Sequence, residues 1–196
     1  LPVLPLFFIY KIEETNYTFE NKAVTVSTLD KKYQDIVDQR VAYQYEFDVP
    51  GDLEGFTCSF ATGVVKGGFL SGDSVERPGQ SPAYDPMLSL GGLSIDTLKC
   101  NKIIVGMKHT FLEGIEKSAI EIFFATDKES SLSQDKSARA AITGNSSGDK
   151  VVEYVLDFSE NEFWTGTVTN IRFDPMSCGG HFDVDYIRFV MDEELA

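Results

Sequence analysis

The chain has 196 residues, of which 42% are hydrophobic, and its formal net charge is −14. This apolar content is enough for the core of one sizeable domain and excludes a disordered chain. The acidic surface would repel polyanions, which excludes nucleic acid as a partner, and no run of about 18 apolar residues is present that would insert into a membrane.

The first 42 residues differ in texture from those that follow. They open with LPVLPLFFIY, an apolar stretch that is short and interrupted by Pro2 and Pro5, and the chain has no initiator Met. We therefore expect a mature or excised fragment, from which any targeting signal would already have been cut away. The expected division is an N-terminal extension at 1–42, either extra strands or the tail of a preceding module, and a main domain at 43–196.

Strand patterns dominate the chain. The segments rich in β-branched and aromatic residues are 23–28, 43–49, 102–111, 119–126, 150–158, 166–173 and 182–190. Residues 27–42 form the one plausible helix. Two stretches rich in Gly, Ser, Pro or charge, 66–86 and 127–150, are expected to be long loops. Short strands without alternating helices favour an all-β, antiparallel sandwich over a βαβ fold.

Catalytic and zinc-binding patterns are missing from the sequence. It contains no Gly-x-Ser-x-Gly, His-Glu-x-x-His or P-loop motif. The cysteines Cys58, Cys100 and Cys178 form no Cys-x-x-Cys pair, and His109 and His181 lie far from any such pair, which argues against a zinc site. A single disulfide bond among the three cysteines is left open.

Several segments, in their order along the chain, carry a resemblance to a known family. They are YEFDVPGDLEGF (45–56), GGFLSG (67–72), DPMLSLGGLSID (85–96), IIVGMK (103–108), AIEIFFAT (119–126) and EFWTGTVTNIRFDP with GGHFDVDYIRFV (162–190). Together they resemble the β-sandwich, or jelly-roll, carbohydrate-binding modules of secreted bacterial proteins that degrade polysaccharides or associate with surface layers. The resemblance implies a galactose-binding-like sandwich, a secreted or cell-surface location, and other domains of a parent chain as partners.

The single tryptophan, Trp164, precedes a strand that is expected to end at Asp174-Pro175, because Pro removes a ladder donor and Asp starts turns. Its ring has two alternative roles. It closes the core beside Gly166, which is the role we favour, or it serves as a flat platform for a sugar.

The resemblance also implies a structural Ca²⁺, held by acidic residues of the first and last strands. The candidate ligands are Glu46, Asp48, Gly51, Asp52 and Asp185. Asp185 shares its expected face with the core residues Ile187 and Phe189, and an inward carboxylate is costly without a cation or donors. Calcium takes about 6–8 oxygen ligands, including backbone carbonyls. In the alternative, Asp185 pairs with Arg172 or Arg188, or is solvated at the strand end.

A sugar-binding face needs aromatic rings beside planar polar groups. If Ile122 and Phe124 face the core, then Glu121 and Phe123 face outward. Exposed Phe is unusual, so Phe123 is the most informative candidate. The candidate sugar-binding residues are Tyr84, Lys108, Glu121, Phe123, Asn170 and Arg172, together with Trp164 in its platform role. The alternative for each of them is that it lies on an ordinary solvated strand face and binds no sugar.

The sequence therefore predicts a non-catalytic, calcium-stabilised carbohydrate-binding module that targets a parent protein to a polysaccharide. A structural or adhesive module of a cell-surface protein, with the same fold and no sugar site, is the main alternative. A jelly-roll glycosidase or lyase is a third, and it would need two carboxylates about 5–9.5 Å apart across a cleft.

Overall fold

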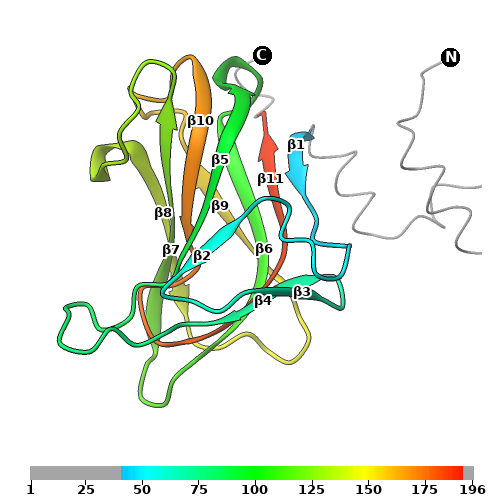
Figure 1. Ribbon diagram of the computed structural model, residues 1–196, viewed down its shortest axis with the longest axis vertical. Helices are drawn as coiled ribbons and strands as arrows, with labels where there is room; N and C mark the ends of the chain where they lie inside the picture. Colours follow the sequence, from blue (N-terminus) through cyan, green and yellow to red (C-terminus); the bar gives the residue numbers. More distant parts are fainter. Residues whose placement is uncertain (1–40, 192–196) are drawn as a thin grey trace, which may run out of the picture. The chain divides into compact units, whose positions relative to one another are not determined.

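The computed structural model describes residues 41–191, which form an antiparallel β-sandwich of two sheets (Figure 1). The first sheet has the order β3-β4-β11-β6-β9, and β1 pairs with β11; the second has the order β2-β5-β10-β7-β8. The strands are β1 Val41–Tyr45, β2 Thr57–Ser59, β3 Val64–Lys66, β4 Phe69–Asp73, β5 Met87–Asp96, β6 Lys102–Phe111, β7 Lys117–Thr126, β8 Ser137–Thr143, β9 Val152–Asp157, β10 Thr167–Asp174 and β11 Gly180–Val190. Two short 3-10 turns, η2 Thr97–Lys99 and η3 Gln134–Lys136, complete the elements. The predicted all-β sandwich is confirmed.

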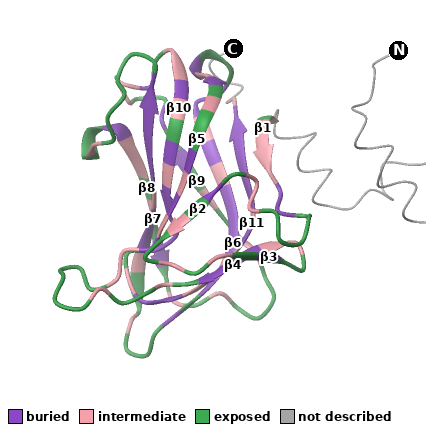
Figure 2. Ribbon diagram, viewed as in Figure 1, coloured by how far each residue is buried: buried purple, intermediate pink, exposed green. Residues whose placement is uncertain are grey.

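The core lies between the sheets and is made of buried residues from strands of both, which are purple in Figure 2. On β6, Ile103, Val105 and Met107 are fully buried in this core, as the alternation of that strand predicts. Tight packing across the sandwich fixes the register of each strand, because a shift of one residue would turn its apolar side chains to the other face. The outer faces are therefore defined by the remaining alternate residues.

The described part of the chain begins with β1. The predicted strand at 23–28 lies outside the described residues, and so does the predicted helix at 27–42 except for its last two residues, which belong to β1. Val41 of β1 pairs with Val190 at the end of β11. No helix in residues 41–191 is long and apolar enough to cross a membrane.

The first predicted strand of the main domain, 43–49, ends early. β1 stops at Tyr45, and Phe47 has a positive φ of 52°. The amide groups of Glu46 and Phe47 donate hydrogen bonds to the carboxylate of Glu54, at 3.1 and 3.0 Å, rather than to a neighbouring strand. A side chain eight residues downstream thus ends the ladder, and nothing in the alternation of 43–49 signals it.

Both predicted loops contain strands. The 66–86 stretch includes β4, and the 127–150 stretch includes β8. In β8 the sequence SARAAIT places Ile142 in the core, with Ala138 and Ala140 packed against it. Alanine and serine have low strand propensity, so the alternation of this strand was masked by its composition.

The aromatic ring of Tyr186 lies on the outer face of the first sheet. The ring packs against the backbone of Gly106 on β6, because a methyl group at that position would come within 2.5 Å of it. The Arg188 guanidinium lies over the same ring, 3.7 Å from its centroid. A bulge at Asp185 in β11 interrupts the alternation on which the inward orientation of this residue was predicted.

Candidate functional site

The outer face of the second sheet brings together four of the predicted sugar-binding residues. Ile122 and Phe124 of β7 are fully buried in the core, which turns Glu121 and Phe123 to the outer face. On the neighbouring strand β10, the residues aligned with this face are Asn170, Arg172 and Asp174, with Arg172 opposite Phe123 and Asp174 opposite Glu121. We call the set of Glu121, Phe123, Asn170, Arg172 and Asp174 the polar face.

At the centre of the polar face, Arg172 packs over the ring of Phe123. The Arg172 guanidinium lies 4.1 Å from the centroid of the Phe123 ring. The same guanidinium donates two hydrogen bonds to the Asp174 carboxylate, from Nε at 2.9 Å and from NH2 at 2.8 Å. Stacking and the two-point bond hold the arginine plane in one orientation. Phe123 is therefore on the outer face as predicted but only 7% exposed.

A second set of hydrogen bonds fixes Glu121. Its Oε1 accepts from Gln134 Nε2 at 2.5 Å and from Ser137 Oγ at 2.8 Å. Gln134 belongs to η3 and Ser137 begins β8, so the short turn between β7 and β8 supplies both donors. This carboxylate, like that of Asp174, has its position determined before any ligand arrives.

The polar face presents planar donors and acceptors. Asn170 is exposed, and it sits beside Gly91 of β5, where a methyl group would come 3.3 Å from its Oδ1. Amide, guanidinium and carboxylate groups in fixed positions suit the paired hydroxyl groups of a sugar, which both donate and accept hydrogen bonds. The guanidinium plane is weakly hydrated, and here it takes the place of an exposed aromatic ring.

Asp174 has an unusual acidity. Burial raises the pKa of Asp174 to about 7; the guanidinium of Arg172 opposes this shift, while the negative charges of Asp85 and Glu121 add to it. The folded protein therefore holds a proton on Asp174 over a pH range in which the unfolded chain has released it. By linkage, this group makes the folded state less stable as pH rises from about 4 towards 7.

We expect Asp174→Asn to remove that dependence. The difference in unfolding free energy between wild type and variant should change progressively from pH 4 to pH 7, with the wild type losing stability relative to the variant. Urea unfolding at a series of pH values measures it. A constant difference across this range would show that Asp174 titrates normally, with Arg172 holding it ionised.

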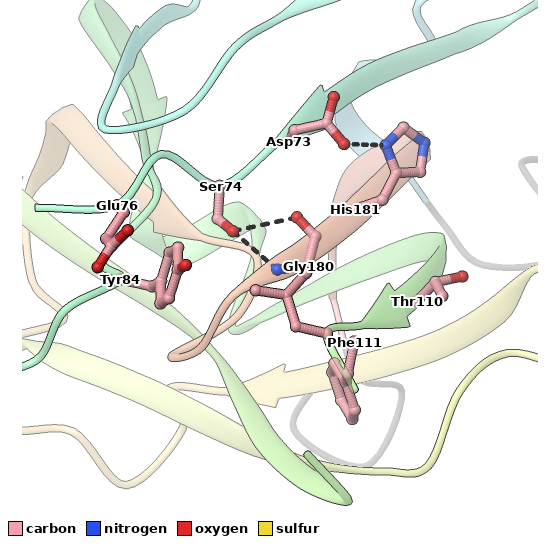
Figure 3. A pocket seen from close by; sticks show the side chains of 9 residues that line it. Asp73, Ser74, Glu76, Tyr84, Thr110, Phe111, Gly180 and His181 are labelled. Carbon is pink, nitrogen blue, oxygen red and sulfur yellow. Dashed lines mark hydrogen bonds and ion pairs between the residues drawn. The ribbon is translucent and has the colours of Figure 1, made fainter. Parts of the chain in front are cut away.

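Two predicted sugar-binding residues lie elsewhere. Lys108 is on β6, in the other sheet, where its Nζ lies 4.1 Å from the centroid of the Phe69 ring and 3.8 Å from Asp183. Tyr84 lines a pocket with residues of β4, β6 and β11 rather than folding over the polar face (Figure 3). Lys108 was wrongly grouped with Phe123 because alternation does not tell which sheet a strand joins, and Tyr84 because its place depends on the path of the segment between β4 and β5.

Trp164 is a core residue, which corrects its assignment to the sugar-binding set. Its ring stacks on Phe158 at a centroid distance of 4.3 Å and meets Phe124 edge-on at 4.8 Å. Its Nε1 donates a hydrogen bond of 2.9 Å to the carbonyl oxygen of Cys100. With one ring face stacked on Phe158 and 7% of the residue exposed, Trp164 offers no platform to a sugar.

The predicted calcium ligands are not gathered into an evident cluster. Within residues 41–191 no three His, Cys, Asp or Glu side chains are grouped as a metal site would need. Glu46 does not fit the ligand role, because its carboxylate accepts a 2.9 Å hydrogen bond from Nε of the buried Arg188. Asp52 Oδ1 accepts from the amide of Glu54, and the amide of Gly51 donates to Val65. Asp48 is exposed and Asp185 half-buried.

Some residues of the site were not predicted. Asp174 was interpreted only as a turn former, although it lies two residues from Arg172 and so shares its face; that spacing was the available signal. Gln134 and Ser137 lay in a predicted loop, and no pattern connected them to Glu121. The three cysteines are free, so the disulfide left open is not formed in this structure.

Comparison with known proteins establishes the fold. No family model and no curated protein matches the chain. Among solved structures, PfGH50B is similar with a TM-score of 0.53 at 6% identity, and an agarase, AgWH50C, with 0.52 at 8% identity. Each match covers 78% of this chain, and the aligned parts are 24% and 26% of those larger proteins. A family 29 carbohydrate-binding module has a TM-score of 0.46 at 13% identity, covering 74% of this chain and 87% of its own.

Proposed function

We propose that residues 41–191 form a non-catalytic carbohydrate-binding domain that holds a polysaccharide on the polar face. The observation that carries this proposal is the fixed arginine plane: Arg172 is stacked on Phe123 and bonded at two points to Asp174. Groups that are already ordered lose little conformational entropy on binding, so even a shallow face gains useful affinity. The similarity in fold to part of an agarase is consistent with this role.

The expected mechanism is targeting. A single site of this kind binds with a Kd of roughly 1 μM to 1 mM, or about −8 to −4 kcal/mol. Weak binding becomes effective when it is linked to another domain, because the polysaccharide then stays at a raised local concentration. A secreted or cell-surface location in a bacterial multidomain protein fits this use and stays a prediction.

The positions of the carboxylates support binding over hydrolysis. Glu121 and Asp174 are opposite each other on β7 and β10, but Glu121 accepts hydrogen bonds from Gln134 and Ser137 while Asp174 is bonded to Arg172. A general acid and a base need to reach the scissile bond from across a cleft. Here both carboxylates instead orient neighbouring donors on an open strand face.

Native affinity electrophoresis tests the proposal. The panel contains agarose, xylans, mixed-linkage and β-1,3-glucans, mannans, pectins and starch. We expect retardation by one class, and Arg172→Ala should weaken it about tenfold or more, since a charged two-point donor is lost. Lys66→Ala, which removes the same charge from an exposed position on β3, is the matched control and should leave retardation unchanged. Equal retardation of Arg172→Ala and wild type would contradict the assignment of the polar face.

A structural or adhesive module is the second candidate, and one observation favours it. Phe123 is covered by Arg172, so the polar face has no exposed aromatic ring. In a structural module, the contact between Arg172 and Phe123 would serve only to stabilise the pairing of β7 with β10. Retardation by none of the polysaccharides would favour this candidate over the first.

Calcium stays a prediction that needs its own measurement. If Asp48 and Asp185 hold a structural ion, EDTA should lower the melting temperature, and added Ca²⁺ should restore it. Asp48→Asn should then melt at the EDTA-treated temperature and no longer respond to the chelator. A wild-type melting temperature that is unchanged by EDTA would contradict the calcium site. Arg188 would then be the counter-charge for Glu46.

A further inference from the structure

A pocket of about 350 Å³ lies at one end of the first sheet, and none of its lining residues belongs to the polar face (Figure 3). It is bounded by the ends of β4 and β6, the beginning of β11 and the segment between β4 and β5. Its lining residues are Asp73, Ser74, Glu76, Tyr84, Thr110, Phe111, Leu112, Gly180 and His181. Its volume is at the lower end of the range for small-molecule sites, which suits one small ligand rather than a length of polymer.

Two glycines shape this pocket. A methyl group at Gly179 would come within 2.5 Å of Leu112 and 3.0 Å of the Tyr84 ring, so these two side chains pack closely against bare backbone. A bridge between Glu76 and Tyr84 holds the two sides of the β4–β5 segment together. Ser74 Oγ accepts a 2.7 Å hydrogen bond from the amide of Gly180, which ties the segment to β11 (Figure 3). The pocket is thus built by contacts between side chains and backbone of the chain itself.

The pocket combines apolar surface with unused polar groups. The Tyr84 ring, Phe111 and Leu112 are its apolar part, and Leu112 is 47% exposed. The Glu76 carboxylate and the hydroxyl groups of Tyr84 and Thr110 have no hydrogen-bond or ion-pair partner among residues 41–191. Carboxylate and hydroxyl groups around an aromatic ring are the partners that a sugar ring uses, since it has an apolar C–H face and a rim of hydroxyls.

The charge of the pocket narrows the choice of ligand further. Asp73 and Glu76 are acidic, and His181 is the only basic side chain in the lining, with Nδ1 2.8 Å from Asp73. An anionic ligand would meet two carboxylates in a partly enclosed space, where repulsion is stronger than in water. A neutral ligand avoids this cost.

We propose that this pocket binds a single neutral sugar residue, with the apolar side of the ring against Tyr84 and Leu112 and its hydroxyls bonded to Glu76 and Thr110. The choice of a sugar rests on the proposed function, whereas the pocket is independent of the polar face. The domain would then have two sites, an outer strand face for a polymer and a partly enclosed end site for one residue, such as a chain terminus.

NMR titration of the full isotope-labelled chain tests the proposal. The probes are neutral methyl glycosides of glucose, galactose, mannose and xylose, and methyl glucuronide as the anionic counterpart. At least one neutral glycoside should shift the amide signals of Ser74, Gly180 and His181 below about 10 mM, ten times a weak Kd of about 1 mM. Tyr84→Ala should weaken this binding about tenfold, and Tyr84→Phe, which keeps the ring, less.

Variants separate the two sites and test the charge. Glu76→Gln keeps hydrogen-bonding groups and removes one carboxylate, so it should bind the glucuronide about threefold or more tightly than wild type does. Arg172→Ala should leave the pocket shifts unchanged. Absence of shifts in the pocket overturns the proposal, and shifts confined to the polar face overturn it while supporting the proposed function. Equal binding of glucuronide and neutral glycosides overturns the assignment to neutral sugars.

Discussion

Replacing Trp164 by Ala is expected to lower the free energy of unfolding by about 3–5 kcal/mol, measured by urea denaturation. The change removes a ring stacked on Phe158 and meeting Phe124 edge-on, and it leaves a cavity between the sheets. It also leaves the carbonyl oxygen of Cys100 without the indole donor. Because a domain of this size has about 5–15 kcal/mol in total, the variant should be only marginally folded.

Two controls separate packing from the hydrogen bond. Trp164→Phe keeps an aromatic ring and loses the Nε1 donor, so it should be destabilised by less than the alanine variant. Val155→Ala truncates an apolar side chain that is 51% exposed and should change stability by at most about 0.5 kcal/mol. A Trp164→Ala protein as stable as wild type would return the residue to the platform role, since an exposed ring can be removed at little cost.

Removal of Arg188 is the second large effect, with an expected loss of about 3–5 kcal/mol for Arg188→Met. Arg188 is fully buried and donates from Nε to Glu46, so the variant removes a positive charge that faces a buried carboxylate. The guanidinium also covers Tyr186 at 3.7 Å, and that contact is lost as well. The measurement is again equilibrium unfolding in urea.

A double-mutant cycle isolates the pair. Glu46→Leu with Arg188→Met removes both charges, and an apolar replacement of a buried ion pair is often neutral or stabilising. The double variant should therefore be more stable than Arg188→Met alone, with a coupling energy within the range of about 0.5–3 kcal/mol typical of contacting residues. Additive effects of the two substitutions would show that the 2.9 Å bond contributes little.

The sequence was sufficient for the parts of the fold that follow strict alternation. β6 was predicted with its correct bounds, because apolar β-branched residues alternate along it, and β7 and β10 were predicted within two residues at each end. β8 was missed because Ala and Ser form a strand here only through packing against Ile142 and β7. The early end of β1 depends on Glu54, a contact that no local pattern encodes.

For the candidate site, the sequence predicted which residues face outward but not what covers them. Alternation placed Phe123 and Glu121 on one face, and the pairing of β7 with β10 brought Arg172 opposite Phe123. Alternation did not predict the low exposure of Phe123, because the Arg172 guanidinium on the next strand lies over its ring. Lys108 was misplaced because assignment to a sheet is decided by long-range pairing, which alternation within a strand does not contain. Tyr84 was misplaced because it lies between β4 and β5, where only an isolated bridge to Glu76 fixes the chain.

The pairing of β1 with β11 has a mechanical consequence. Val41 and Val190 face each other at the same end of an antiparallel pair, whose register runs on to Tyr45 and Ile187. Tension applied between these two points would open the pair like a zipper, because the force acts on one pair of ladder bonds at a time. Once β1 has peeled away to Tyr45, the next residue to leave is Glu46, bonded to the buried Arg188. Resistance to pulling would therefore pass from the ladder bonds of β1 to the groups that hold Glu46 and Phe47, namely Arg188, the Glu54 carboxylate and the core around the buried Phe47.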